Sequence, residues 1–286
     1  MKLTNVHNVP LALGVWLVAD NYDYQDRKDY ISVTSLMRPI RQLVLSSRTI
    51  QSSLEADLAD FASRTMGNAL HDSIEKAWIN NYRKSMEILG YPKQVIDRIL
   101  INPSPELLAR TKDAIPIYLE QRSFKQVGKW TVGGKFDMVA EGVVHDNKST
   151  TAYTWLTGDK DKDYQLQGSL YRWLNPDKIT EDFIRINFIF TDWSKASART
   201  DPKYPQAKVQ AKEVPLLSIE ETQAWVENKL AQIEKYWDLP DAQIPECTDD
   251  ELWRAAQHEG AQHQAEQRHE DAGPEGRPEA IQMKAV

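Results

Sequence analysis

The stretch Gly133–Thr150, GGKFDMVAEGVVHDNKST, decides the fold that we expect for this chain. Apolar and polar residues alternate on both sides of Glu141–Gly142, as they do in half-buried strands. A Glu-Gly pair between two such segments predicts a tight turn and therefore a hairpin. Because side chains alternate with a period of two, Asp146 and Lys148 share one face of the second strand, and the turn brings Asp137 near Asp146.

Two carboxylates beside a lysine indicate metal chemistry. Carboxylate and carbonyl oxygens are hard ligands that suit Mg²⁺ or Mn²⁺, and the backbone carbonyl of Asn147 lies beside the expected cluster. A lysine next to such a metal can orient a bound water and steady the charge of a phosphate. The cluster therefore suits phosphodiester hydrolysis. D-x-K also occurs by chance, and a surface salt bridge of Lys148 with Asp146 or Asp137 explains the same residues.

The remaining pattern predicts one mixed α/β fold with a helical N-terminal portion. Expected helices cover 31–48, 54–90, 161–175, 218–239 and 244–257, with short helices in 92–110. Expected strands cover 115–127, 128–142, 143–150, 183–193 and 207–217. Thr34 or Ser35 is the expected N-cap of the first helix, Asp163 caps the helix after the hairpin, and Ser218 forms a capping box with Glu221.

Composition limits the classes of protein that the chain can belong to. With 286 residues and a net charge of -7, it is no basic nucleic-acid coat, so any contact with DNA needs a local basic patch or metal ions. The single cysteine, Cys247, excludes an internal disulfide and an iron–sulfur cluster. The apolar run 11–19 is too short to span a membrane, and we expect an amphipathic or buried segment there.

Two helical segments carry polar residues at helical spacing. Gly67, His71 and Glu75 are four residues apart and share one helix face, where Gly67 lets another backbone approach and His71 can bind a metal. Gln167 and Tyr171 share a face of the helix after the hairpin, and both could face the aspartates. Each pattern alone is more typical of an ordinary helix; their order along the chain is informative.

That order resembles the PD-(D/E)XK nuclease superfamily, in its RecB-like exonuclease branch. The branch is marked by G-x-x-x-H, G-x-x-D, (D/E)-x-K and Q-x-x-x-Y motifs. Here these read Gly67 to His71, Gly134 to Asp137, Asp146 to Lys148 and Gln167 to Tyr171. The flanking segments also resemble nuclease-like proteins of tailed bacteriophages. The helicase loop G-x-x-x-x-G-K-[ST] is missing from the sequence, which indicates a stand-alone nuclease module.

The resemblance implies a restriction-endonuclease-like core and a set of roles. The residues that it assigns to a Mg²⁺ or Mn²⁺ ion are His71, Asp137, Asp146 and the carbonyl of Asn147. Asp137, Asp146 and Lys148 are the implied catalytic residues, Gln167 and Tyr171 support the site and the DNA backbone, and Glu120 and Glu75 are accessory acids. The resemblance covers roughly 66–172, and the order of expected elements extends it to one nuclease-like domain at 1–254, with a helical part at 1–112, a core at 113–215 and C-terminal helices at 216–254. We expect a disordered tail at 255–286.

The expected function is a metal-dependent DNA exonuclease of phage recombination, replication or repair, located in the cytoplasm. Lys195, Arg199 and Lys203 lie in a basic segment that could follow phosphates, or could be a merely solvated loop. An annealing or single-strand-binding protein and a second copy of the chain are open as partners, and a membrane is not expected. The alternative is a catalytically silent DNA-binding or protein-interaction member of the same fold. The salt-bridge alternative predicts that His71, Asp137 and Lys148 lie far apart.

Overall fold

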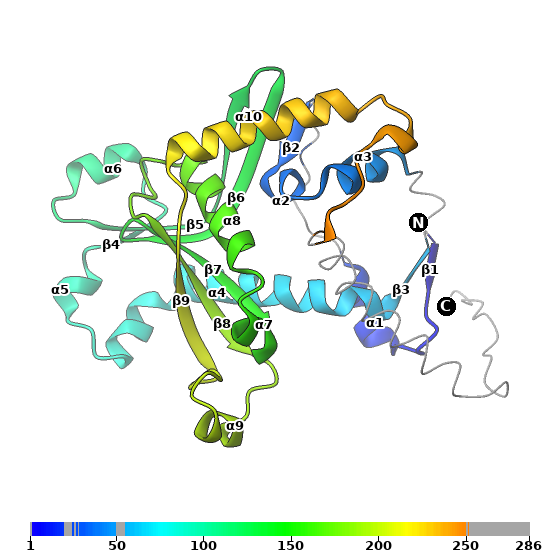
Figure 1. The fold of residues 1–286 in the computed structure, drawn as a ribbon. Helices are drawn as coiled ribbons and strands as arrows, with labels where there is room; N and C mark the ends of the chain where they lie inside the picture. The colour runs from blue at the N-terminus through cyan, green and yellow to red at the C-terminus, as the bar shows by residue number, and fades with distance from the viewer. Residues whose placement is uncertain are drawn as a thin grey trace, which may run out of the picture. The chain divides into compact units, whose positions relative to one another are not determined.

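The computed structural model describes residues 2–19, 25, 27, 29–49, 55–249 and 251 (Figure 1). The chain divides into two compact units, and each is described by itself. One comprises Met1–Ala19, Pro39–Phe61 and Ile233–Val286, and the other comprises Asp20–Arg38 and Ala62–Gln232. The expected single domain at 1–254 stays a prediction. The expected tail at 255–286 lies outside the described residues.

Ten α-helices and nine strands form in the described residues. The helices are α1 (Leu11–Val18), α2 (Val33–Leu36), α3 (Ile40–Arg48), α4 (Ala62–Ile88), α5 (Lys93–Ile96), α6 (Pro105–Arg110), α7 (Ala152–Thr157), α8 (Asp161–Leu174), α9 (Lys195–Thr200) and α10 (Ile219–Tyr236). The strands are β1 (Lys2–Thr4), β2 (Tyr30–Ser32), β3 (Glu55–Asp57), β4 (Ile99–Ile101), β5 (Ile115–Val127), β6 (Trp130–Ala140), β7 (Val143–Thr150), β8 (Phe183–Phe190) and β9 (Val209–Pro215).

The larger unit is built on one mixed sheet. Its described strands run in the order β4-β5-β6-β7-β8-β9, and β2 also pairs with β6. The β5–β6, β6–β7 and β8–β9 pairs are antiparallel, whereas β7 and β8 are parallel and are joined through α7 and α8. Helices flank this sheet, as Figure 1 shows. The expected fold class, a mixed α/β sheet flanked by helices, is confirmed.

The hairpin that decided the expected fold is present. β6 ends at Ala140 and β7 begins at Val143, which leaves Glu141 and Gly142 as the two turn residues. Both have positive φ, 50° and 79°, as a two-residue turn between right-twisted strands requires. The Gly142 carbonyl also accepts hydrogen bonds from the backbone N–H groups of Thr180 and Glu181.

Two glycines let α8 and α2 approach the sheet closely. A Cβ on Gly168 of α8 would lie 2.8 Å from the Cβ of Ile184 on β8. A Cβ on Gly134 of β6 would lie 2.8 Å from Val33 and 3.2 Å from Tyr171. Side chains of this size would push the helices away from β6 and β8, so these glycines fix the position of α8.

Several local expectations were wrong. The expected helix at 31–48 is divided into α2 and α3, because Pro39 disfavours helical backbone at Arg38. Ser32 caps α2 in place of Thr34 or Ser35. No side chain caps α8: Asp163 lies in its first turn, and its N-cap is Lys160.

The surroundings of Gly67 and of helix α1 also differ from what the sequence predicted. α4 runs through Gly67, and no described atom outside the helix's own backbone lies within 4 Å of a Cβ placed there, so the expected approach of another backbone is not seen in the described residues. Helix α1 is neither amphipathic nor buried, because only Gly14 and Leu17 are buried while Leu11 and Val15 are exposed. Among the described residues, no helix combines the length and the apolar character that crossing a bilayer requires.

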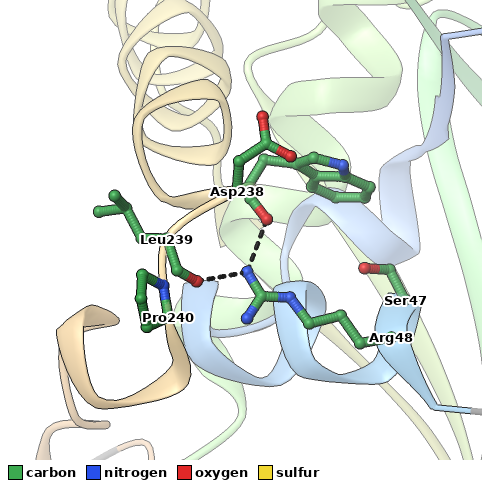
Figure 2. A pocket seen from close by; sticks show the side chains of 6 residues that line it. Ser47, Arg48, Asp238, Leu239 and Pro240 are labelled. Atoms are coloured by element: carbon green, nitrogen blue, oxygen red, sulfur yellow. Dashed lines mark hydrogen bonds between the residues drawn. The ribbon is translucent and has the colours of Figure 1, made fainter.

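A pocket in the smaller unit is a structural junction. It is lined by Ser47, Arg48, Trp237, Asp238, Leu239 and Pro240 (Figure 2). The Arg48 guanidinium donates to the carbonyls of Trp237 at 2.6 Å and Leu239 at 2.8 Å, and also pairs with Asp241. These bonds satisfy carbonyls just after α10, as a cap does, so the pocket needs no ligand to explain it.

Gly67 of α4 and Gly168 of α8 predict opposite effects of the same substitution. Gly67→Ala should raise the free energy of unfolding by up to about 1 kcal/mol, because alanine is the better helix former and the site is open. Gly168→Ala should lower it by about 1–2 kcal/mol, because overpacking against Ile184 outweighs the gain in helix propensity. Urea unfolding of both variants measures this. A stabilised Gly168→Ala variant would show that α8 does not pack as described.

Candidate active site

The two strands of the hairpin separate at Asp137. β5 pairs with β6 along one edge, so β2 and β7 must share the other edge, at Thr131–Gly133 and Met138–Ala140. Continuing the β6–β7 register would pair Asp137 with Asp146, but the ladder ends at Met138. Instead, Asp137 Oδ2 accepts a hydrogen bond of 3.1 Å from the backbone N–H of Asn147. The carboxylate therefore replaces a backbone acceptor where the strands diverge.

His71 joins Asp137 from helix α4. Its Nδ1 lies 3.0 Å from Asp137 Oδ2, and both side chains are partly exposed. The hydrogen bond to Asp137 raises the pKa of His71 above its usual 6.5, and partial burial opposes that effect. Because α4 is a continuous helix of 27 residues here, His71 is held on a rigid element.

Asp146 and Lys148 form an ion pair beside this contact, in which Asp146 is buried and Lys148 is partly exposed. Lys148 Nζ lies 2.7 Å from Asp146 Oδ2, and the Asp146 side chain is only 3% exposed. Burial raises the pKa of Asp146, and the charge of Lys148 opposes that effect. Burial alone would lower the pKa of Lys148, but the Asp146 carboxylate keeps it above its usual value. Although Lys148 is close, Asp146 Oδ2 has no hydrogen-bond donor of proper geometry among the described residues.

Gln167 and Tyr171 support Asp146 from helix α8. Gln167 Nε2 lies 3.3 Å from Asp146 Oδ1 and 3.1 Å from the Tyr171 hydroxyl, and it donates to both. Tyr171 is only 6% exposed, and burial raises its pKa far above the usual range. This burial favours a role in positioning Asp146, and a contact between Tyr171 and DNA stays a prediction.

Glu120 lies nearer to the centre of the site than an accessory role suggests. In the β5–β6 register it falls opposite Asp137, between the Leu119–Met138 and Gln121–Phe136 pairs. Ligand atoms of His71, Glu120 and Asp137 lie within 4.8 Å of one another. Glu120 has a φ of 50°, and such left-handed backbone at a non-glycine residue is enriched at functional sites.

Lys135 is the basic neighbour of these acids. Its Nζ lies 2.5 Å from Glu120 Oε2. Burial raises the pKa of Glu120, and the bond from Lys135 opposes the effect. Glu75 of α4 also acts electrostatically on Lys135. The sequence pattern missed Lys135, although it lies two residues before Asp137 and the strand period could have indicated it.

The donor set fits a divalent metal ion. One imidazole nitrogen and two carboxylates converge at His71, Glu120 and Asp137, and oxygen-rich sets of this kind suit Mg²⁺ or Mn²⁺. The buried Asp146 Oδ2 beside them has no hydrogen-bond donor of proper geometry in the described structure, and a metal ion could coordinate this oxygen instead. Asn147 contributes its backbone N–H to Asp137, and its side chain accepts from Asn187.

The contact between His71 and Asp137 contradicts the salt-bridge alternative, which requires these residues to lie far apart. Asp146 is buried, so its pairing with Lys148 is no surface salt bridge either. The charge of Lys148 also acts on His71, which places all three groups in one electrostatic cluster.

The expected basic segment forms a folded lobe after β8. Lys195 and Arg199 lie on the short helix α9, and Lys203 follows it; all three are exposed. Inside the lobe, Trp193 Nε1 donates to the Pro205 carbonyl at 2.8 Å. At its base, Asp192 accepts from the backbone N–H of Ala152, which begins α7 soon after the D-x-K strand. The lobe is thus tied to the end of β7.

No family model matches the chain, and no curated protein matches it. Solved structures do resemble it. The protein SSO0001 is 14% identical with a TM-score of 0.43, over 73% of this chain and 79% of its own. A protein from Eubacterium rectale, provisionally described as an exonuclease, is 14% identical with a TM-score of 0.40, over 79% of this chain and 86% of its own.

A phage-related exonuclease from Haemophilus somnus 129PT is also 14% identical, with a TM-score of 0.31, over 75% of this chain and 95% of its own. At these identities and TM-scores, the likenesses carry no argument about function. The function therefore has to be inferred from the side chains of this chain.

The electrostatics of His71 predict a pH dependence in metal-free protein. A raised pKa means that the His71–Asp137 pair stabilises the fold fully below pH 6.5 and loses this contribution as the pH rises through the pKa of His71. In EDTA, His71→Asn should therefore lower the free energy of unfolding more at pH 6 than at pH 9.

His145 provides the matched control. Burial, followed by the charge of Arg185, lowers its pKa to about 4, so it is neutral across that pH range in the folded protein. The unfolded chain takes up a proton at this histidine near pH 6, so the loss of stability in His145→Asn should be smaller at pH 6 than at pH 9, the opposite trend to His71→Asn. NMR titration that gives His71 a pKa at or below 6.5 would contradict the described contact.

Proposed function

We propose that this chain is a metal-dependent deoxyribonuclease, an exonuclease of the RecB-like branch of the PD-(D/E)XK superfamily. The observation that carries the proposal is the convergence of His71, Glu120 and Asp137 beside Lys148 and the buried Asp146. The four motifs that suggested this activity lie on α4, β6, β7 and α8. α4, β6 and β7 carry charged side chains that lie close together, and α8 carries Gln167, which hydrogen-bonds to Asp146.

The proposed metal ligands are His71, Asp137 and Asp146, with the carbonyl of Asn147, and Glu120 is added by its position. Mg²⁺ or Mn²⁺ bound by these groups would polarise the scissile phosphate and lower the pKa of an attacking water. Gln167 keeps the Asp146 carboxylate in place, since its amide bonds Asp146 Oδ1 on one side and the Tyr171 hydroxyl on the other.

Lys148 acts through its ammonium group. Asp146 keeps the pKa of Lys148 raised, so Nζ carries its protons and can donate to the attacking water or to a phosphate oxygen. Its positive charge offsets negative charge that develops on the phosphate. The side chain is about one third exposed, so it can reach a substrate while its Nζ stays beside Asp146.

The choice of an exonuclease over an endonuclease rests on the resemblance of the four motifs. A role in phage DNA recombination, replication or repair, a cytoplasmic location, and partnership with an annealing or single-strand-binding protein are parts of the same proposal. Self-association is a further prediction, which the elution volume of the purified protein tests.

Purified protein should degrade linear DNA with Mg²⁺ or Mn²⁺ and not with EDTA. Lys148→Ala and Asp137→Asn should each lower the rate by at least about 100-fold, because each removes a group that acts on the reacting atoms. Lys84→Ala is the matched control, since Lys84 is exposed on α4 thirteen residues beyond His71, and its rate should equal the wild-type rate.

Circular DNA separates the two modes of cleavage, because an exonuclease leaves a covalently closed circle intact. Circular dichroism of each variant establishes that it is folded. Metal-dependent DNA binding without cleavage by the wild type would favour the catalytically silent alternative. If the wild type neither binds nor cleaves DNA, the proposal is refuted.

The basic lobe is proposed to follow the DNA backbone. Changing Lys195, Arg199 and Lys203 together to Gln should weaken DNA binding equally for all sequences. It should also reduce the slope of log affinity against log salt by about 2 to 3, because each phosphate contact contributes roughly 0.7 to 0.9. Fluorescence anisotropy over a range of NaCl concentrations measures the slope. An unchanged slope would show that the lobe is only a solvated loop.

A further inference from the structure

A ladder of cross-strand pairs on β5 and β6 leads away from the candidate active site. Glu120 falls opposite Asp137, Arg122 pairs with Lys135, and Phe124 pairs with Gly133. Directly opposed residues on antiparallel strands project to the same face. Two residues further along β5 and β6, the acidic pair Glu120–Asp137 is therefore followed by the basic pair Arg122–Lys135 on the same face.

Lys135 lies beside the candidate active site but has no role in the proposed hydrolysis. Its side chain is 38% exposed while its Nζ contacts Glu120, and Glu75 acts on it from α4. A partly exposed ion pair contributes little to stability and exchanges its partner easily. Lys135 can therefore leave Glu120 for another anion at small cost.

Arg122 lies on β5, directly opposite Lys135. Its guanidinium NH1 donates to the Tyr30 hydroxyl at 3.4 Å, and its charge acts on Lys135. Two cations held opposite each other repel, which favours an anion between them. Beyond them, the guanidinium of Arg27 lies 4.0 Å from the centre of the Phe124 ring, so positive charge continues along the ladder.

We propose that Arg122 and Lys135 form a phosphate subsite, which holds the phosphate next to the scissile one in a bound DNA strand. This inference rests on the proposed nuclease function and deepens it. Two residues along a strand span about 7 Å, which is comparable with the separation of adjacent phosphates in one nucleic-acid strand. The scissile phosphate lies at the Glu120–Asp137 step and its neighbour at the Arg122–Lys135 step.

The same arrangement couples substrate and metal. In the free protein, Lys135 neutralises Glu120, and Glu120 lies within reach of the His71 and Asp137 ligand atoms. When Lys135 turns to the phosphate, the Glu120 carboxylate loses its counter-charge and becomes available to a cation. DNA with an anion at this position therefore favours metal binding at Glu120, and the converse holds equally.

The test replaces single phosphates of the substrate by neutral methylphosphonates. Two short linear DNAs are compared, one for each end of the strand. Each carries a single methylphosphonate at the linkage next to the first scissile bond of that end. Release of the terminal nucleotide gives kcat/KM for each substrate and for the all-phosphate DNA. For the wild type, the ratio of the two values should be about 10 to 100 at one end, as expected for a lost charged hydrogen bond.

Lys135→Gln should reduce this ratio by at least about threefold, because the variant has lost one of the two partners of that phosphate while Arg122 keeps the other. Lys135→Arg, which keeps the charge, should restore most of the ratio. Lys125→Gln is the matched control: Lys125 lies on the same hairpin, next to Phe124, and its Nζ sits over the Trp173 ring. Its ratio should equal that of the wild type.

The outcomes separate this inference from the function on which it rests. A merely structural effect of Lys135→Gln would lower kcat/KM on both substrates equally and leave the ratio unchanged, which would overturn the subsite. A wild type that cleaves DNA but tolerates every neighbouring methylphosphonate would overturn the subsite and keep the nuclease proposal. A wild type that releases no nucleotide would overturn both.

Discussion

The hydrogen bond from the Asn147 N–H to the Asp137 carboxylate is the contact on which the site depends. It stands where the β6–β7 ladder would otherwise continue, so the two strands separate without leaving this backbone donor unsatisfied. The separation leaves the edge of β6 without a strand partner between its pairings with β2 and β7. It also lets α4 deliver His71 to the same carboxylate oxygen. A single side chain thus ends the ladder and begins the site.

Three acids meet here, and each has a basic partner. Asp137 pairs with His71, Asp146 with Lys148 and Glu120 with Lys135. Carboxylates this close would repel one another if they were alone, and pairing keeps the cluster compatible with folding when no cation is bound. The partners differ in exposure: Lys148 lies beside a buried acid, whereas His71 and Lys135 contact acids that solvent reaches. The exposed pairs exchange more easily, which fits them for giving way to a metal or a phosphate.

Local patterns predicted the hairpin, its turn and the D-x-K face, because these depend on strand period and turn chemistry alone. The capping box of Ser218 and Glu221 was equally local, and both of its hydrogen bonds form. Where long-range contacts decide, the sequence failed. Nothing in the helical period of α4 shows that Gly67 is open, and an alternating strand gives no sign of the left-handed backbone at Glu120. The strand period places Lys135 on the face of Asp137, but its contact with Glu120 depends on β5, whose register the pattern does not fix.

The groups proposed for hydrolysis and the groups proposed to bind DNA lie on different kinds of structure. The groups proposed for chemistry lie on β5, β6, β7 and α4, and Asp146 is fixed further by Gln167 and by the buried Tyr171 behind it. Gly168 and Gly134 keep α8 close enough for that support to reach Asp146. The groups proposed to hold DNA are exposed, on the lobe after β8 and at Lys135. Reacting atoms need positions fixed to a fraction of an ångström, whereas a phosphate backbone needs only charge at the right spacing. The proposed function therefore assigns the first need to packed strands and the second to solvent-exposed cations.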